Sequence, residues 1–270
     1  MIEGSENLIC VTCGTQFLGS PERCPICEDS RQFVGWEGQR WTTLTAIAGK
    51  HRNEIREEEQ GLFSIQTEEK FAIGQRAYLI QNPEGNVLWD CVSLLDEATI
   101  GRIQSLGGIA AIAISHPHYY ATMVDWSRAF GNAPICLHEY SQKWVMRPHG
   151  NIQFWSGETK QLPGGLTLIN TPGHFRGFQV LHSGRYANDR GALFSGDQPR
   201  VCMDRRWVTF MYSYPNYIPL APAVVRGIAE RLARYQFDRI YAAVPGWVMP
   251  TGAQEAVNRS ADRYLSAIAL

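Results

Sequence analysis

The sequence predicts a layered α/β protein preceded by a small cysteine-rich segment. Three observations favour this fold class. Short stretches of strand character alternate with amphipathic stretches of helix character, one apolar run is continuous, and four of the seven cysteines form two closely spaced pairs. A chain of 270 residues with 44% hydrophobic and 19% charged residues has room for a sizeable core. We therefore expect one large α/β domain with a small appendage.

Composition and charge exclude several classes of function. A formal net charge of −1 gives no general attraction to nucleic acid or to an anionic membrane. No apolar run approaches the ~20 residues of a membrane span. The start, MIEGSENLIC, has early acidic residues and no long apolar stretch, so we do not expect a secretory signal. We expect a cytoplasmic protein that acts on a small molecule, with neither membrane nor nucleic acid as a partner.

The two cysteine pairs predict a metal site near the N-terminus. The stretch CVTCGTQFLGSPERCPIC contains Cys10, Cys13, Cys24 and Cys27 as two C-x2-C pairs. Two such turns supply four sulfurs in the tetrahedron that Zn²⁺ prefers, and Gly14 allows the positive φ that such a turn often requires. Four thiolates complete the coordination, so we expect a structural zinc in a ribbon over residues 1–35. The alternatives are two disulfides or a redox C-x-x-C. No Lys/Arg cluster follows, which favours a docking or stabilising role.

The rest of the chain divides into a connecting arm over residues 36–60 and a main domain over 61–270. The arm is polar, and we expect a short helix in it, over residues 51–59. In the main domain, strands are expected over residues 61–67, 77–81, 86–91, 109–115, 133–138, 166–171, 178–183, 192–197 and 238–244. Helices are expected over residues 94–108, 121–130, 139–145, 221–235 and 251–270.

Candidate metal ligands follow three of these strands. His116 and His118 come after the continuous apolar run IAAIAIS, and side chains at i and i+2 of an extended segment face the same way. His174 follows a strand and a Thr-Pro-Gly turn, and Asp197 ends the strand ALFSGD. Imidazole and carboxylate are ligand types that zinc or iron would use. The pattern therefore predicts a second metal site, at strand ends.

These segments resemble a known family. NVLWDC, ISHPHYY, TPGHFRG and FSGD are similar in order and approximate spacing to motifs of the metallo-β-lactamase-fold hydrolases, including glyoxalase II-like enzymes, over roughly residues 60–270. The resemblance implies an αββα sandwich with a metal centre at the strand ends. His116 and His118 match the first two histidines of the family pattern His-x-His-x-Asp-His. His174 matches the histidine after the Pro-Gly turn, Asp197 the metal-bridging aspartate, and Asp90 a structural acid.

The chain also departs from the family pattern. Tyr120 and Ala121 stand where the pattern has aspartate and histidine, and PGWVM offers no match for the last family histidine. The tri-histidine half of a dinuclear site is thus complete, whereas the other half keeps only Asp197. We therefore expect one metal ion, zinc or iron, in place of two.

The resemblance implies a metal-dependent hydrolase for esters, thioesters or lactones. Zinc on the three histidines would activate water, with Asp197 as a fourth ligand or as the base that orients the water. The hydroxyl of Tyr120 would donate a hydrogen bond to a developing oxyanion in place of the missing metal. Two alternatives stay open. One is a sulfur dioxygenase-like enzyme with iron on His116, His174 and Asp197. The other is a non-catalytic binding protein with a relic site.

Overall fold

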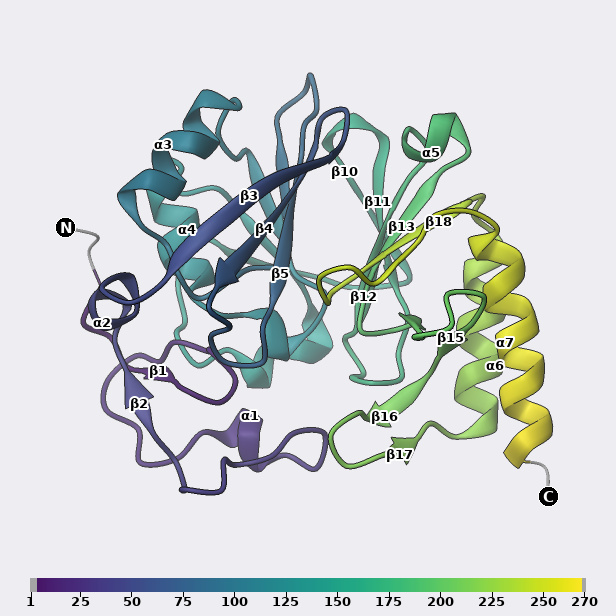
Figure 1. Cartoon of the computed structure of the whole chain (residues 1–270), viewed down its shortest axis with the longest axis horizontal. Coiled ribbons are helices and arrows are strands. Elements are labelled where there is room, and N and C mark those ends of the chain that lie inside the picture. The colour runs from purple at the N-terminus through teal and green to yellow at the C-terminus, as the bar shows by residue number, and fades with distance from the viewer. Residues whose placement is uncertain (1–3, 269–270) are drawn as a thin grey trace. The chain divides into compact units, whose positions relative to one another are not determined.

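The chain folds into two compact units, Met1–Trp155 and Ser156–Leu270. The structure is a computed structural model, and it describes residues 4–268 (Figure 1). In both units strands alternate with helices, as the sequence predicts. Among the described residues, no helix combines the length and the apolar character needed to cross a membrane.

The first unit is built on a seven-stranded sheet. In spatial order its strands are β3 (Arg52–Glu59), β4 (Leu62–Glu68), β5 (Arg76–Ile80), β6 (Val87–Trp89), β7 (Ala111–Ala113), β8 (Ile135–His138) and β9 (Ile152–Trp155). Pairing is antiparallel from β3 to β6 and parallel from β6 to β9. The parallel strands are connected through α3 (Glu97–Ser105) and α4 (Met123–Ala129). The carboxyl ends of β6 and β7 therefore lie at the same edge of the sheet, next to the histidine motif.

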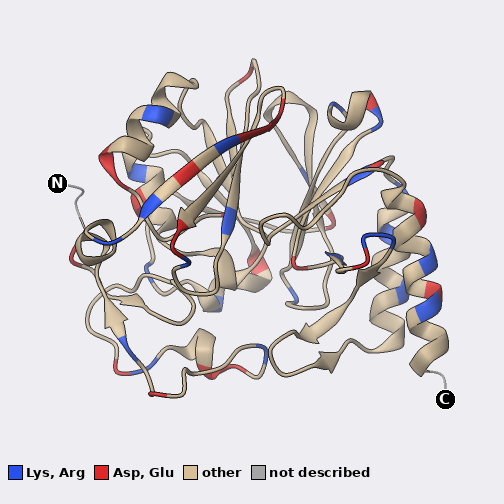
Figure 2. Ribbon diagram, viewed as in Figure 1, with Lys and Arg blue, Asp and Glu red and all other residues tan. Residues whose placement is uncertain are grey.

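The helix predicted over residues 51–59 is wrong, because residues 52–59 form the edge strand β3. This strand pairs with β4 through a register that sets Ile55 opposite Ile65. Arginine and glutamate, which have high helix propensity, make up most of β3. Figure 2 shows charges of both signs along this strand. Because Ile55 is the only apolar residue of β3, the strand shows no hydrophobic periodicity, either helical or extended. Pairing with β4 therefore overrides the local propensity.

The N-terminal part of the first unit contains short elements. These are β1 (Ile9–Cys10), α1 (Pro25–Glu28), β2 (Trp41–Thr42) and α2 (Leu44–Ala48). Strand β2 lies in the predicted arm but pairs with β1 of the predicted ribbon, with Trp41 opposite Cys10. The arm thus supplies one strand to the cysteine-rich segment and one, β3, to the large sheet. Two 3₁₀ helices, η1 (Pro117–Tyr119) and η2 (Glu139–Trp144), complete the unit.

The second unit has a six-stranded sheet and two long helices. In spatial order its strands are β10 (Thr159–Leu162), β11 (Leu166–Asn170), β12 (Gln179–Ser183), β13 (Ala192–Gly196), β18 (Arg239–Ala242) and β19 (Val248–Met249). Only β13 and β18 pair in parallel. The helices α6 (Pro222–Leu232) and α7 (Ala253–Ile268) lie side by side (Figure 1). The shorter elements are η3 (Pro163–Gly165), α5 (Tyr186–Asp189), β14 (Arg200–Val201), β15 (Val208–Thr209), β16 (Met211–Ser213) and β17 (Ile218–Pro219).

Each sheet has a buried apolar core. Leu79, Ile112 and Trp126 are fully buried in the first unit. Leu193 and Phe194 of β13 are fully buried in the second unit. Burying one such side chain stabilises the fold by about 1.5–3 kcal/mol, so these strands are firm supports for the polar residues at their ends.

Candidate metal centres

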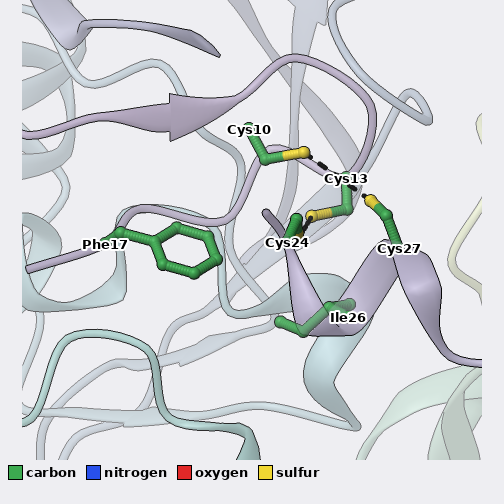
Figure 3. Close-up of a cluster of buried hydrophobic side chains, with 6 residues drawn as sticks. All are labelled: Cys10, Cys13, Phe17, Cys24, Ile26 and Cys27. Atoms are coloured by element: carbon green, nitrogen blue, oxygen red, sulfur yellow. Dashed lines mark hydrogen bonds between the residues drawn. The ribbon is translucent and has the colours of Figure 1, made fainter. Parts of the chain in front are cut away.

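Four buried cysteines of the first unit converge, as the spacing predicts. The Sγ atoms of Cys10 and Cys27 are 3.6 Å apart, as are those of Cys13 and Cys24 (Figure 3). All four sulfurs lie within 4.8 Å of one another, and none is in a disulfide. Sulfurs at about 2.3 Å from one tetrahedral Zn²⁺ would be ~3.8 Å apart. The group therefore fits a single metal ion, and the disulfide alternative does not hold.

Local backbone turns bring the cysteines together. The amide of Gly14, which has φ +77°, donates to the carbonyl of Cys10 at 2.8 Å and closes the first turn. In the second pair, the amide of Cys27 donates to the carbonyl of Cys24, the residue that precedes α1. Phe17 and Ile26 pack beside the sulfurs (Figure 3). Local turns and packing thus place both pairs so that their sulfurs meet.

The proximity of the sulfurs separates the pKa values of their thiols. Hydrogen bonds from Cys13, Cys24 and Cys27 lower the pKa of Cys10. The hydrogen bond to Cys10 is the main cause that raises the pKa of Cys13 and of Cys27, and burial adds to it. Four buried thiolates at these distances repel one another unless a cation balances them. The donor set is therefore suited to a divalent cation.

We expect Cys24→Ser to remove one zinc atom per chain when the protein is saturated with zinc and then desalted. A serine hydroxyl is not ionised near pH 7 and cannot replace a thiolate in the tetrahedron. The large sheets should remain folded, with faster proteolysis confined to the N-terminal segment. Cys136→Ser, at a buried cysteine outside the cluster, is the matched control. Unchanged zinc content in Cys24→Ser would contradict the ribbon assignment.

The second candidate group consists of His116, His118, His174 and Asp197, all buried. The first unit supplies His116 and His118, directly after β7. His116 is extended, with φ −168° and ψ 172°, and the 3₁₀ helix η1 begins at Pro117. The segment is therefore not extended throughout, as the i, i+2 argument assumes. The turn still leaves the two imidazole ring centroids 5.0 Å apart, so the histidines are neighbours for a different geometric reason.

A buried acid fixes the strand end that carries these histidines. Asp90 follows β6, and its Oδ1 accepts a hydrogen bond from the amide of Ser115 at 2.7 Å. The hydroxyl of Ser115 lies 2.8 Å from Nδ1 of His116. Asp90 has φ +60°, a conformation that a non-glycine residue keeps only where the surroundings hold it. Asp90 thus positions the loop, as the resemblance implies.

In the second unit His174 has its ring orientation set by the backbone. Its Nδ1 is 2.8 Å from the carbonyl oxygen of Tyr212, which makes Nδ1 the donor and leaves Nε2 as the atom suited to a metal. Its amide donates to Oε1 of Gln198 at 2.8 Å, and Nε2 of Gln198 donates to the carbonyl of Thr171. A Cβ on Gly173 would lie 2.5 Å from Oε1 of Gln198, so the glycine is required for this approach.

Asp197 lies directly after β13, at the end of the strand that the sequence predicts. Its carboxylate-bearing side chain is buried, and its main-chain carbonyl accepts a hydrogen bond from the hydroxyl of Tyr214 at 2.5 Å. Burial first, and then the charge of Asp197, raise the pKa of Tyr214, so this phenol stays protonated as a donor. Tyr214 also packs edge-on against His174, with centroids 5.8 Å apart. It therefore supports both candidate ligands of the second unit.

The two tyrosines after His118 differ in their surroundings. The ring of Tyr119 is 5.1 Å from that of His116. Tyr120 lines a small pocket together with residues of the cysteine-rich segment, among them Thr15 and Gln16. Burial raises the pKa of Tyr120, and the neighbouring Ser141 hydroxyl opposes this rise. The phenol is thus protonated at neutral pH, and its role in catalysis stays a prediction.

Several supporting residues carry no sequence signal. Gln75, Gln198 and Tyr214 are single polar side chains in apolar or irregular stretches, with no motif around them. They act through contacts with residues 17 to 62 positions away along the chain. Only the position of Gln198, directly after Asp197, would have drawn attention to one of them.

Comparison with known proteins agrees with this architecture. No protein-family model matches the chain. The solved structures that resemble it include DIM-1 metallo-β-lactamase, with 12% identity and a TM-score of 0.58 over 79% of this chain and 98% of that one. A Cronobacter sakazakii metallo-β-lactamase with a HARLDQ motif has 17% identity and a TM-score of 0.52 over 80% and 94% of the two chains. The chain thus has the metallo-β-lactamase fold, an α/β fold, with a four-cysteine cluster near the N-terminus.

A closer relative defines the family. YmaE of Bacillus subtilis (strain 168) is 49% identical over 265 residues, which cover 96% of each chain. The chain belongs to the same family as YmaE.

Proposed function

We propose that the chain is a metal-dependent hydrolase with two metal ions of different function. A structural zinc binds to Cys10, Cys13, Cys24 and Cys27. A single catalytic zinc binds to His116 and His118 from the first unit and to His174 and Asp197 from the second. The main support is that all four residues of the second group are buried, are of ligand type and follow strands of a metallo-β-lactamase fold.

The supporting contacts are those that a metal ligand needs. Metal-bound histidines usually donate the second ring N–H to a carbonyl or another acceptor, which fixes the tautomer. His174 has such a partner in the carbonyl of Tyr212, and His116 has Ser115 beside its Nδ1. In His174, Nε2 is then the nitrogen available to a metal.

A zinc ion held by these residues would supply a water with a pKa of about 7 and would polarise the substrate oxygen. Asp197 acts as a ligand or holds the proton of the attacking water at its carboxylate. The phenol of Tyr120, kept protonated by burial, is the proposed donor to the developing oxyanion. Esters, thioesters and lactones are the proposed substrate class, because each presents a carbonyl to such a site.

Elemental analysis of the purified full-length chain tests this proposal. We expect two zinc atoms per chain, together with hydrolysis of at least one member of an ester, thioester and lactone panel. His116→Ala and His174→Ala should each remove the same one atom, and the double variant should remove no more. Loss of two atoms in the double variant would contradict a shared site. Iron as the second metal would favour the dioxygenase alternative, and a single metal per chain would favour the binding protein.

A further inference from the structure

The cysteine cluster and the histidine motif are joined by buried hydrogen bonds within the first unit. We call residues 10–16 the first knuckle and residues 116–122 the histidine loop. Gln75 lies between them and directly precedes β5. Its Nε2 donates to the carbonyl of Cys13 at 2.7 Å and to the carbonyl of His118 at 3.0 Å. One amide group thus holds the backbone of a ligand from each metal group.

Two further links run in parallel with Gln75. The amide of Gln16 donates directly to the carbonyl of Ala121 at 3.0 Å. The hydroxyl of Ser93 donates to the carbonyl of Gly14 at 2.9 Å, and the carbonyl of Ser93 accepts from Oγ1 of Thr122 at 3.0 Å. The first knuckle is therefore attached to the middle of the histidine loop at His118 and to its end at Ala121 and Thr122.

These links are isolated from water. Gln75 is 4% exposed and Ser93 is 2% exposed, so a carbonyl that lost its donor would stay buried. The approach is also close, because a Cβ on Gly14 would lie 2.4 Å from the hydroxyl oxygen of Ser93. Movement of the knuckle therefore strains these hydrogen bonds or moves the loop residues that they hold.

The histidine loop depends on external support. Ala121 has φ +44°, in the left-handed region that is strained for a residue with a Cβ. Such a conformation persists only where neighbouring structure holds it. The amide of Gln16 in the first knuckle holds the carbonyl of this same residue. The knuckle is therefore one source of the loop's shape.

We propose that Gln75 is a positioning residue that couples the two metal sites. Metal on the four cysteines fixes the first knuckle. Gln75, which is hydrogen-bonded to the knuckle and to the carbonyl of His118, then restricts the backbone of His118 as well. Each metal therefore raises the metal affinity of the other site. Because coupling is reciprocal, metal at the histidines also strengthens binding at the cysteines. The inference rests on the proposed function for the second metal, but the ordering of the loop by the knuckle does not.

The first test is zinc affinity of the full-length chain, measured by competition with a chromophoric chelator. Gln75→Met keeps the length of the side chain and removes both hydrogen bonds. We expect the histidine site to bind zinc ten- to a hundredfold more weakly, the usual effect of losing a residue that supports a ligand. Gln81→Met is the matched control, because Nε2 of Gln81 also donates to a carbonyl, that of Leu106 at 2.8 Å. Its zinc affinity should equal that of the wild type.

A second test does not depend on metal at the histidines. Hydrogen exchange of the backbone amides of residues 116–122 is compared before and after Cys24→Ser removes the ribbon metal. We expect the exchange to accelerate in that loop and to stay unchanged in β12 of the second unit. If Gln75→Met does not fold, Ser93→Ala should give the same acceleration at the end of the loop, towards Thr122.

The outcomes separate the two proposals. Wild-type protein with one metal per chain, together with accelerated loop exchange in Cys24→Ser, refutes the proposed hydrolase and the coupling of metal affinities, and supports the ordering of the loop by the knuckle. Two metals per chain, with unchanged affinity in Gln75→Met and unchanged loop exchange in Cys24→Ser, supports the hydrolase and overturns the coupling.

Discussion

His116→Ala should lose hydrolytic activity by about two orders of magnitude or more and should lose one zinc atom per chain. The imidazole is buried directly after β7, and alanine would leave the proposed metal with one protein ligand fewer. Removing the metal removes both the polarised substrate oxygen and the activated water. The measurement is kcat/KM on whichever panel substrate the wild type hydrolyses, with zinc determined on the same samples.

The control for this prediction is His51→Ala. His51 lies before β3, and its Nδ1 is 2.7 Å from the carbonyl of Glu69, so it belongs to neither metal group. Its removal should change kcat/KM by less than a factor of two. Equal activity and equal zinc content in wild type and His116→Ala would show that His116 is not a ligand.

Arg147→Met should destabilise the fold by about 3–5 kcal/mol, because it leaves a buried carboxylate without its cation. Asp125 of α4 is fully buried, and Arg147 Nη1 lies 2.5 Å from its Oδ1. Gln16 completes the group by donating to the other carboxylate oxygen at 2.8 Å. The free energy of unfolding from urea denaturation of the zinc-loaded protein measures the effect.

An exposed ion pair provides the matched control. Arg206 and Asp204 are 2.8 Å apart, but their side chains are 80% and 44% exposed. Arg206→Met should therefore change the free energy of unfolding far less than Arg147→Met does, because solvent screens the exposed pair. The double variant Asp125→Leu/Arg147→Met should recover part of the loss, since no unpaired charge remains. A small effect of Arg147→Met, similar to that of Arg206→Met, would mean that water reaches Asp125 in the native state.

The sequence indicates the candidate ligands because each one carries a local signal. The cysteines have zinc spacing, and His116, His174 and Asp197 each follow a strand or a turn of recognisable composition. The conformation of the histidine motif was harder to predict from the sequence. The sequence His116-Pro117-His118 is compatible with an extended segment or with a turn. The 3₁₀ turn in the structure goes together with the ring contact between Tyr119 and His116 and with the hydrogen bond from Gln75 to the carbonyl of His118.

Elements and contacts with no local signal were not predictable. The charged residues of β3 favour a helix, and the strands β9, β10 and β14 to β17 are too short, at two to four residues each, to show a period. The network of Gln16, Asp125 and Arg147 joins positions 109 and 22 residues apart. Nothing in the sequence around Gln16 indicates that it meets α4. Such contacts follow from the complete fold of the first unit.

The charged edge strand β3 has a consequence for how concentrated solutions of this protein behave. β3 ends the order of its sheet, and an eight-residue strand in that position is a template for pairing with another chain. Arg52, Glu54 and Arg56 place charges along it, and the register shifts between Glu57 and Glu59. Charged side chains on the same face of an edge strand oppose the addition of a further strand, and so does a β-bulge. The charged composition of β3, which wrongly predicts a helix, thus protects the protein against intermolecular β-pairing and aggregation.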